Sequence, residues 1–428
     1  MRQKLLDTLL EETFYKSWRG EISNNNYWPS IEFIVNGKCD QHCKYCYIAN
    51  YGDKLFPEGS QNDQMILDNT SMIMRWLKKN SFRPRIDLFS AEIFSQEIGF
   101  QVLELISDLG WEGMAVGIPS NFNFLFRGDD TQRVLDINDK AIKRGQSLLL
   151  SSSVDGKFME DNRPLASGKL RDDAFYDKLF SIWKILHHGF HPMVYSEGIE
   201  RWKDNFLWYQ SNFDKYGIPY HNLYLLEVRN KEWTKDQSLQ LGFFVEFLVK
   251  WLVEKTKSDD EFLRSIFSNG AFNLLSSPCL YNSRGMTCSV QTTEMVRLGD
   301  LSIWPCHRTM YPALKLAQME VVDEEIVRIK EVNYPLYLAT KYGDRLNFPY
   351  CVACDIKELC TGGCYGSQFE ITGDLFTPIP TMCMMEHAKV FSLLKALKYS
   401  TNIWSNLKLK VVDKKRIAIQ NLEVRGLI

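Results

Sequence analysis

Short apolar segments that alternate with longer amphipathic ones limit how this chain can fold more than any other feature. The apolar segments predict six β-strands, at residues 31–35, 85–89, 113–118, 147–151, 191–195 and 223–228. Helices are predicted around residues 65–79, 94–109, 140–144, 172–188, 199–216 and 236–255. Strands and helices in alternation predict parallel β/α units. A full barrel needs eight such units, so six predict an α/β fold with a partial (β/α)6 TIM barrel.

The composition excludes several classes of protein. Hydrophobic residues make up 45% of the 428 residues and charged residues 24%, which excludes a disordered or collagen-like chain. Lys and Arg (51) nearly balance Asp and Glu (53), and a net charge of −2 gives no long-range field for nucleic acid. The N-terminal segment lacks the apolar stretch of a secretion signal, and no segment approaches the roughly 20 apolar residues of a membrane helix. We therefore expect a cytoplasmic protein with no nucleic-acid or membrane partner.

A group of three cysteines follows the first predicted strand directly. Cys39, Cys43 and Cys46 have the spacing C-x3-C-x2-C, and an odd total of 11 cysteines without a secretion signal argues against a disulfide framework. Because iron–sulfur clusters are normally held by four thiolates, three would leave one iron of a 4Fe–4S cluster open to another ligand. The alternative is a zinc site completed by His42. His42 is adjacent to Cys43, however, and neighbouring residues rarely reach one tetrahedral metal together.

This motif, with the aromatic Tyr45 just before its last cysteine, resembles that of the radical S-adenosylmethionine (SAM) superfamily. The resemblance implies that the amino and carboxylate groups of SAM bind the open iron. It also implies that one-electron reduction cleaves SAM to a 5′-deoxyadenosyl radical, which abstracts hydrogen from a substrate C–H bond. The expected cofactors are therefore SAM and a 4Fe–4S cluster held by Cys39, Cys43 and Cys46.

Polar residues at the ends of the predicted strands extend the resemblance. Glu92 matches the family's Gly-Gly-Glu-Pro motif, although both glycines and the proline are replaced, and Asn121 matches a Thr-Asn turn after the third strand. Ser153 and Arg163 match a Ser-x-Asp-Gly…Asp-x-x-Arg pattern, with one residue instead of two before the Arg. In the family the Ser contacts the SAM ribose and the Arg its carboxylate, which suits a guanidinium fork. With Tyr45, these are the expected SAM-binding residues. The alternative for each is a helix cap or a turn.

The other eight cysteines resemble the SPASM extension of radical SAM enzymes, which carries two auxiliary 4Fe–4S clusters. The segment from Cys351 to Cys364 has the spacing C-x2-C-x5-C-x3-C. The family's interleaved pattern implies one cluster held by Cys279, Cys288, Cys306 and Cys364. It implies a second cluster held by Cys351, Cys354, Cys360 and Cys383, so that three clusters use all the cysteines. Gly299 lies farther from Cys306 than in the family. Two structural zinc sites are the alternative, since zinc accepts the same knuckle spacing.

The predicted domains follow from these motifs. We expect an N-terminal extension (1–29), a radical SAM partial barrel (30–258), a SPASM domain (259–390) and a C-terminal tail (391–428). The tail is expected to include the end of a helix over 387–397 and a segment at 407–412. Because only 38 residues precede Cys39, we expect no complete leader-recognition module in the chain.

Three functions compete, two of which the resemblance implies and a third that belongs to another class of protein. The first is a maturase that forms a thioether or C–C crosslink in a ribosomally synthesised precursor peptide. The second is an anaerobic sulfatase-maturating enzyme that oxidises Cys or Ser to formylglycine. The third is a non-enzymatic iron–sulfur or zinc adaptor. The expected partners are the peptide, an electron donor such as flavodoxin or ferredoxin, and a separate leader-recognition protein.

The sequence predicts no catalytic acid or base. Glu197, Glu227, Arg229 and Tyr47 follow predicted strands or the cysteine loop, but a salt bridge or a core contact is the favoured interpretation for each. His187 and His188 end a predicted helix, where a cation favours the helix dipole, and they are interpreted as structural.

Overall fold

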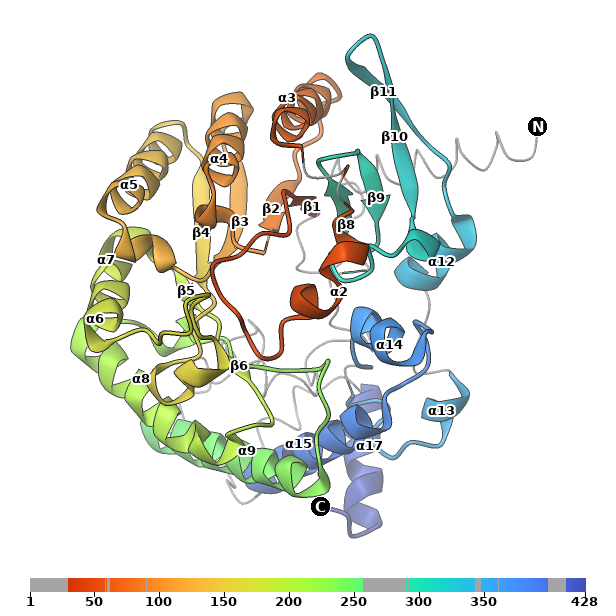
Figure 1. Ribbon diagram of the computed structural model, residues 1–428. Coiled ribbons are helices and arrows are strands. Elements are labelled where there is room, and N and C mark those ends of the chain that lie inside the picture. Colours follow the sequence, from red (N-terminus) through yellow and green to blue (C-terminus); the bar gives the residue numbers. More distant parts are fainter. Residues whose placement is uncertain are drawn as a thin grey trace. The chain divides into compact units, whose positions relative to one another are not determined.

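The computed structural model describes residues 30–57, 59, 62–89, 91–256, 290, 293–342, 348–360, 362–398 and 413–428 (Figure 1). The predicted N-terminal extension, Cys279, Cys288 and the segment 407–412 lie outside the described residues. The chain divides into two compact units. Unit 1 comprises Met1–Ser153, Pro164–His188 and Ser289–Gly343, and unit 2 comprises Val154–Arg163, Gly189–Cys288 and Asp344–Ile428.

Unit 1 is built on a sheet with a parallel centre. The strands β1 (Ser30–Ile34), β2 (Arg85–Phe89), β3 (Ala115–Ser120) and β4 (Ser147–Ser152) lie side by side and parallel, which confirms the first four predicted strands. On its other side β1 pairs in parallel with β8 (Thr293–Arg297). The antiparallel strands β9 (Ser302–Trp304), β10 (Ala317–Val322) and β11 (Glu325–Lys330) continue the sheet beyond β8. These four later strands were not predicted.

The two faces of this sheet differ in polarity. Ile31, Ile86, Val116 and Leu148 are aligned across β1–β4 and buried. Figure 1 shows helices α3 (Asp63–Lys79), α4 (Glu97–Leu109) and α5 (Gly128–Lys143) on the outer side of these strands. Successive side chains of a strand point to opposite faces, so the residues between these apolar ones face the other way. Because helices cover this apolar face, the strands and helices of unit 1 carry apolar residues at regular spacings. That regular spacing is why the sequence predicts them.

The opposite face carries polar pairs. Ser30 Oγ lies 2.7 Å from Thr293 Oγ1, and the Arg85 guanidinium lies 2.7 Å from Asp87 Oδ1. Gly117 of β3 makes room for this ion pair, because a methyl group there would come within 1.9 Å of Asp87 Oδ1. Interior glycine is unfavourable in a strand unless a neighbour approaches closely, as here.

Unit 2 contains shorter strands and longer helices. Gly189–Phe190 forms β5, and β6 (Met193–Val194) pairs in parallel with β7 (Leu226–Glu227). The predicted fifth and sixth strands therefore exist only as two-residue pieces. Helices α8 (Trp202–Tyr216), α9 (Lys235–Thr256) and α15 (Pro380–Lys398) confirm three predicted helices. At Gly242 of α9 a methyl group would lie 2.5 Å from Ser392 Oγ of α15, so glycine allows these helices to pack closely.

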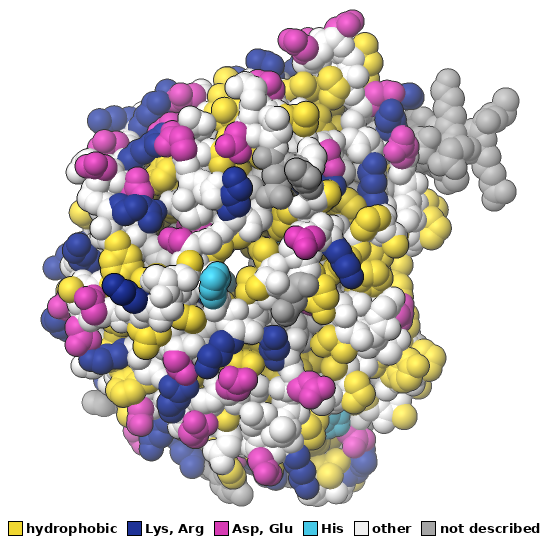
Figure 2. Space-filling model, viewed as in Figure 1, with side chains coloured by type: hydrophobic (Ala, Val, Ile, Leu, Met, Phe, Trp, Pro, Cys, Tyr) yellow, Lys and Arg dark blue, Asp and Glu magenta, His cyan; other side chains and the backbone are white. Residues whose placement is uncertain are grey.

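The remaining α-helices are shorter. They are α2 (Tyr47–Leu55), α6 (Asp173–Ser181), α7 (Trp183–Leu186), α12 (Tyr334–Tyr342), α13 (Pro349–Val352), α14 (Tyr365–Thr372) and α17 (Asp413–Val424). In the ranges given above, no helix combines the length and hydrophobicity that crossing a membrane requires. The face drawn in Figure 2 carries acidic and basic side chains interspersed. A mixed α/β fold with a parallel sheet is thus confirmed, whereas closure into a six-unit barrel stays a prediction.

Candidate active site

The loop between β1 and α2 carries the first three cysteines. It is tied to the segment after residue 163 by two backbone hydrogen bonds, from His42 N to Pro164 O (2.9 Å) and from Ala166 N to Asp40 O (2.9 Å). Cys46 is the residue that immediately precedes helix α2. None of the nine cysteines that the structure describes is in a disulfide. The loop thus presents three thiols where the C-terminal end of β1 meets a helix.

The thiols of this loop are not arranged as an assembled ligand set. Cys39 is exposed, yet the surrounding protein desolvates its sulfur and, together with the nearby Glu92 charge, raises the pKa of the thiol well above its ordinary value. The Cys43 charge adds to this effect. No three Cys, His, Asp or Glu side chains converge as a metal site anywhere in the described ranges. The donor chemistry suits an iron–sulfur cluster, and the ligand assignment stays a prediction.

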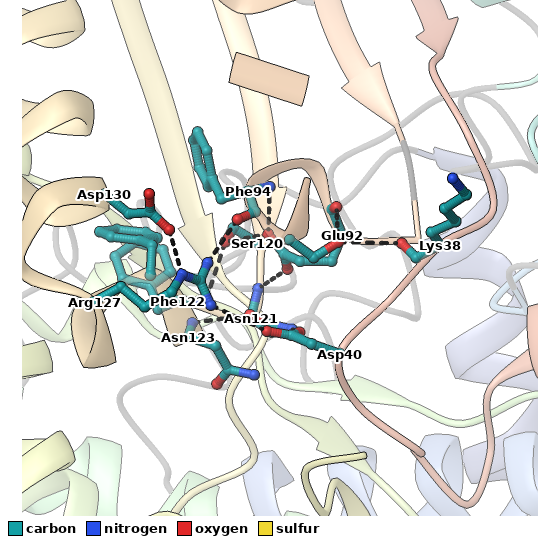
Figure 3. Close-up of polar contacts among 12 residues, drawn as sticks. Lys38, Asp40, Glu92, Phe94, Ser120, Asn121, Phe122, Asn123, Arg127 and Asp130 are labelled. Carbon is teal, nitrogen blue, oxygen red and sulfur yellow. Dashed lines mark hydrogen bonds and ion pairs between the residues drawn. The ribbon is translucent and has the colours of Figure 1, made fainter. Parts of the chain in front are cut away.

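Glu92 is the centre of a buried hydrogen-bond cluster at the ends of β2 and β3 (Figure 3). It is 3% exposed, and its carboxylate accepts hydrogen bonds from Phe94 N (3.1 Å), Ser120 Oγ (2.8 Å) and Asn121 N (2.5 Å). Burial raises the pKa of Glu92 to about 7, against the lowering effect of these three donors. Its own N–H donates to Lys38 O at 3.1 Å, beside Cys39. The cluster therefore joins two strand ends to the cysteine loop.

Asn121 extends the cluster to the cysteine loop from the other side. Its side-chain amide donates to Asp40 Oδ1 at 2.6 Å and its side-chain oxygen accepts from Asn123 N at 2.9 Å. Arg127 lies 3.7 Å from Asp40 Oδ2, donates to Phe94 O at 2.7 Å and pairs with Asp130. Asp40 is thus held between an amide and a guanidinium, which fixes the loop one residue after Cys39.

Asn123 is a candidate contact residue that the sequence did not reveal. It is 2% exposed, and neither its side-chain nitrogen nor its side-chain oxygen has a hydrogen-bond partner among the described residues. In Figure 3 its side chain extends away from Glu92. An unsatisfied buried amide costs about 1–3 kcal/mol, so such a group is a candidate for binding a ligand. Its position two residues after Asn121 was the only available signal.

Ser153 and Arg163 occupy different units. In unit 1, Ser153 N donates to Ser120 O at 2.6 Å, which places Ser153 beside the end of β3. In unit 2, Arg163 Nε donates to Asp155 Oδ1 at 2.8 Å, and Met193 N donates to the same oxygen at 2.8 Å. Asp155 is fully buried and Arg163 is 8% exposed. The guanidinium is therefore oriented by a buried carboxylate.

The segment that contains Cys306 packs within unit 1 against the start of α2. The His307 ring stacks on Phe89 at 4.3 Å, and its Nδ1 lies 3.2 Å from Glu32 Oε2. The Arg308 guanidinium lies 4.8 Å from the ring centre of Tyr47, the residue after Cys46. His307 was missed by sequence reasoning, although it directly follows a predicted ligand. The two residues that follow Cys306 thereby contact Phe89 at the end of β2 and Tyr47 at the start of α2.

The five described C-terminal cysteines lie in unit 2. Burial, and then the charges of Cys351 and Cys354, raise the pKa of Cys383 to about 11. Cys354 Sγ lies 3.3 Å from His387 Nε2, four residues after Cys383 on α15. Burial raises the pKa of Cys360 to about 12, and its sulfur accepts from Gly362 N at 3.2 Å. His387 is a further residue that the sequence did not single out, although a Cys-x3-His spacing on a helix was visible.

Comparison with known proteins adds evidence from structure alone. No family model and no curated protein matches the sequence. Among solved structures, anSMEcpe with bound AdoMet and Cp18Cys peptide has a TM-score of 0.54 at 15% identity, covering 88% of this chain and 100% of that chain. Histidine-tagged anSMEcpe with bound AdoMet has a TM-score of 0.56 at 15% identity, with 92% and 98% coverage. Streptococcus suis SuiB bound to precursor peptide SuiA has a TM-score of 0.52 at 14% identity, with 88% and 80% coverage.

The chain has the fold of radical SAM enzymes. This confirms the fold that the cysteine motif implied. Within the radical SAM fold of this chain, the structure brings Glu92 and Asn121 together and places Ser153 at the same strand ends. Tyr45, which lies between Cys43 and Cys46 in the sequence, is buried. Arg163 belongs to unit 2, where its partner is Asp155.

Proposed function

We propose that this chain is a radical SAM enzyme that modifies the side chains of a peptide. The observation that carries the proposal is the buried carboxylate of Glu92, held at the ends of β2 and β3 next to a loop with three thiols. A ligand that has both an amine and a carboxylate needs one anionic and one cationic partner. The buried carboxylate beside the cysteine loop supplies the anionic partner, which suits the amine of such a ligand.

The proposed cofactors follow the predicted residues. Cys39, Cys43 and Cys46 would hold a 4Fe–4S cluster, and SAM would contact Tyr45, Glu92, Asn121, Ser153 and Arg163. When bound, this pair supplies a 5′-deoxyadenosyl radical that abstracts hydrogen from the substrate. The protein's own part is to bind and orient: Glu92 receives a cationic amine, and Asp155 holds the Arg163 guanidinium in place for a carboxylate.

The C-terminal cysteines are proposed to hold two auxiliary 4Fe–4S clusters. One would be bound by Cys279, Cys288, Cys306 and Cys364, and the other by Cys351, Cys354, Cys360 and Cys383. The second set is supported by the electrostatic influence of Cys351 and Cys354 on the pKa of Cys383. Since every iron would then have a protein ligand, these clusters would relay electrons. The partial barrel (30–258) and a SPASM domain (259–390) remain the proposed domains.

A ribosomally synthesised precursor peptide is the proposed substrate, with a thioether or C–C crosslink as product. SuiB, which shares the fold, was crystallised with its precursor peptide SuiA. A second candidate is formylglycine formation in a sulfatase, since the fold also matches anSMEcpe over that chain's whole length. Flavodoxin or ferredoxin would donate electrons, and a separate protein would recognise the leader peptide.

The test is anaerobic purification followed by three measurements. Three clusters predict about 12 irons per chain. Reduced protein should cleave SAM to methionine and 5′-deoxyadenosine. A precursor peptide encoded beside the gene and a Cys-containing sulfatase motif peptide are then offered in parallel. A crosslink removes two hydrogens only, whereas formylglycine formation from Cys removes two hydrogens and also replaces sulfur by oxygen. Zinc in place of iron, or intact SAM, would overturn the proposal.

A further inference from the structure

The side chain of Asn123 is buried in unit 1 without a hydrogen-bond partner. Asn123 is 2% exposed, and neither its side-chain oxygen nor its side-chain nitrogen bonds to any residue that the structure describes. An asparagine amide offers an acceptor oxygen and two N–H donors, and most buried side chains of this kind are paired. An unpaired buried amide is unfavourable, because it has lost its hydrogen bonds to water without replacing them. Stability alone therefore gives no reason for an asparagine at this position.

The polar groups next to Asn123 are paired, which sets its side chain apart. Ser120 Oγ donates to Glu92 at 2.8 Å and accepts from Phe122 N at 3.0 Å. Both ends of the Asn121 side-chain amide are bonded, and its oxygen accepts from the backbone N–H of Asn123 at 2.9 Å. The turn thus holds the backbone of Asn123 in place, while its side-chain amide is left for another molecule.

The residues on either side of Asn123 cannot supply the missing partners. Phe122 and Phe124 are 0% and 1% exposed, with ring centres 5.0 Å apart, and their side chains have no hydrogen-bonding groups. Phe122 has a left-handed backbone (φ +62°), which is rare for a bulky residue and is concentrated at ligand sites. In a turn with a purely structural role, leucine would fill the place of Asn123 among these rings without an unpaired amide.

Asn123 lies where the proposed SAM-binding residues of unit 1 meet. Glu92, Asn123 and Ser153 follow β2, β3 and β4, which are neighbours in that order. In Figure 3 the side chain of Asn123 extends away from Glu92, the residue proposed to receive the amine of SAM. Hydrogen transfer requires contact between the two reactants, so SAM and the peptide would meet at these strand ends.

We propose that Asn123 binds a molecule held at these strand ends by pairing with a neighbouring hydrogen-bond donor and acceptor. The inference rests on the proposed function. Two groups there present this chemistry. The adenine of SAM has a donor amino group beside an acceptor ring nitrogen, and a peptide amide of the substrate has a donor N–H and an acceptor C=O. The amine, ribose and carboxylate of SAM have proposed partners in Glu92, Ser153 and Arg163, whereas these two groups have none.

The experiment compares Asn123→Leu with the unmutated full chain, both purified anaerobically. Calorimetry measures the affinity for SAM, for 5′-methylthioadenosine, and for the precursor and sulfatase motif peptides described above. If adenine is the partner, SAM and 5′-methylthioadenosine should both bind at least tenfold more weakly, with peptide affinity unchanged. If a peptide amide is the partner, only peptide affinity should fall at least tenfold. Glu92→Gln is the contrasting variant: it should weaken SAM but not 5′-methylthioadenosine, which lacks the amine.

Thermal unfolding without ligand separates a binding role from a structural one. Asn123→Leu removes an unpaired polar group, so its unfolding midpoint should equal or exceed that of the unmutated protein. Asn121→Leu loses side-chain hydrogen bonds to Asp40 and to the backbone of Asn123, and it should unfold at a lower temperature. Asn123→Ala, which adds no bulk, should lose affinity for the same molecule as Asn123→Leu.

The outcomes separate this inference from the proposed function. If both Asn123 variants keep their affinity for every probe that the unmutated protein binds, the inference alone is wrong. It is also wrong if both variants have ligand-free midpoints as low as that of Asn121→Leu, because the amide would then be needed for folding. An unmutated protein that binds neither SAM nor a peptide would overturn the proposed function and the inference together.

Discussion

The carboxylate of Glu92 accepts a hydrogen bond from the backbone N–H of Asn121 at 2.5 Å, so the residues that follow two neighbouring strands are joined directly. Parallel strands present their C-terminal ends at one edge of a sheet, where enzymes of this architecture place their chemistry. The contact fixes Glu92 in a position that the surrounding backbone determines, because the Phe94 N–H donates to the same carboxylate.

Replacing Glu92 by Gln should weaken SAM binding at least tenfold and leave the iron content unchanged. The amide keeps the shape of the side chain but removes the negative charge that a cationic amine needs, and a tenfold loss corresponds to about 1.4 kcal/mol. Anaerobic calorimetry measures this binding. Glu97→Gln is the control, since Glu97 is a largely exposed carboxylate on α4 that pairs with Arg133. Equal affinities of the two variants would contradict the role proposed for Glu92.

Replacing Gly117 by Ala should destabilise the protein by about 1–3 kcal/mol, the usual cost of overpacking a well-filled site. The new methyl group would lie 1.9 Å from Asp87 Oδ1 and 2.6 Å from Arg85 Nη2, so the ion pair must move. Urea unfolding measures the change in the free energy of unfolding. At Gly128, the first residue of α5, no atom lies within 4 Å of an added methyl group. Gly128→Ala should therefore be neutral or slightly stabilising, and a similar loss in both variants would show that the contact at Gly117 is unimportant.

The free energy of unfolding should fall as the pH drops below about 6.5, because His188 is buried in its neutral form. Burial, and then the charge of His187, lowers the pKa of His188 to about 3, so the unfolded chain binds a proton that the folded chain excludes. This destabilising contribution to the free energy of unfolding is absent above pH 6.5. It grows by about 1.4 kcal/mol for each pH unit down to about pH 3. Unfolding at several pH values measures the slope.

The matched pair for this measurement is His188→Phe and His221→Asn. The ring of His188 lies 4.5 Å from that of Phe122, so an aromatic replacement suits its surroundings, whereas His221 is exposed. His188→Phe should reduce the slope of stability against pH between about 6.5 and 3, and His221→Asn should not. A slope that is the same in the wild-type and His188→Phe proteins would be evidence against a neutral, buried His188.

The first four strands were predictable because their apolar residues alternate and pack under helices. Ile31, Ile86, Val116 and Leu148 form one buried row, and the repeated pattern is visible in the sequence. Strands β6 and β7 have two residues each. The apolar segments from which they were predicted are longer than the part that pairs with a neighbouring strand. Strand length there depends on hydrogen-bond partners, which a single sequence does not reveal.

The candidate site was predictable to the extent that it is local in sequence. The cysteine spacing and the carboxylate of Glu92 are readable directly, whereas the 3.2 Å contact between Glu32 and His307 joins positions 275 residues apart. Strand β8, which pairs with β1, brings that distant segment into unit 1. The network of Glu227, Arg229, Glu386 and Lys389 likewise depends on a contact across 162 residues, between Lys389 and Glu227. Salt bridges were expected at Glu227 and Arg229, but not their partners on α15.

Replacing Cys383 by Ala should remove about four of the proposed 12 irons, because one 4Fe–4S cluster loses a ligand. Cys383 lies on α15 in unit 2, so the variant leaves the loop of Cys39, Cys43 and Cys46 in unit 1 intact. Cleavage of SAM should therefore continue, while modified peptide fails to accumulate because the electron relay is interrupted. Iron analysis, 5′-deoxyadenosine assay and peptide mass spectrometry measure the three quantities. Met384→Ala, the adjacent position on the same helix, should keep both the iron and the product. Normal product formation by the Cys383→Ala protein would exclude an electron-relay role for this cluster.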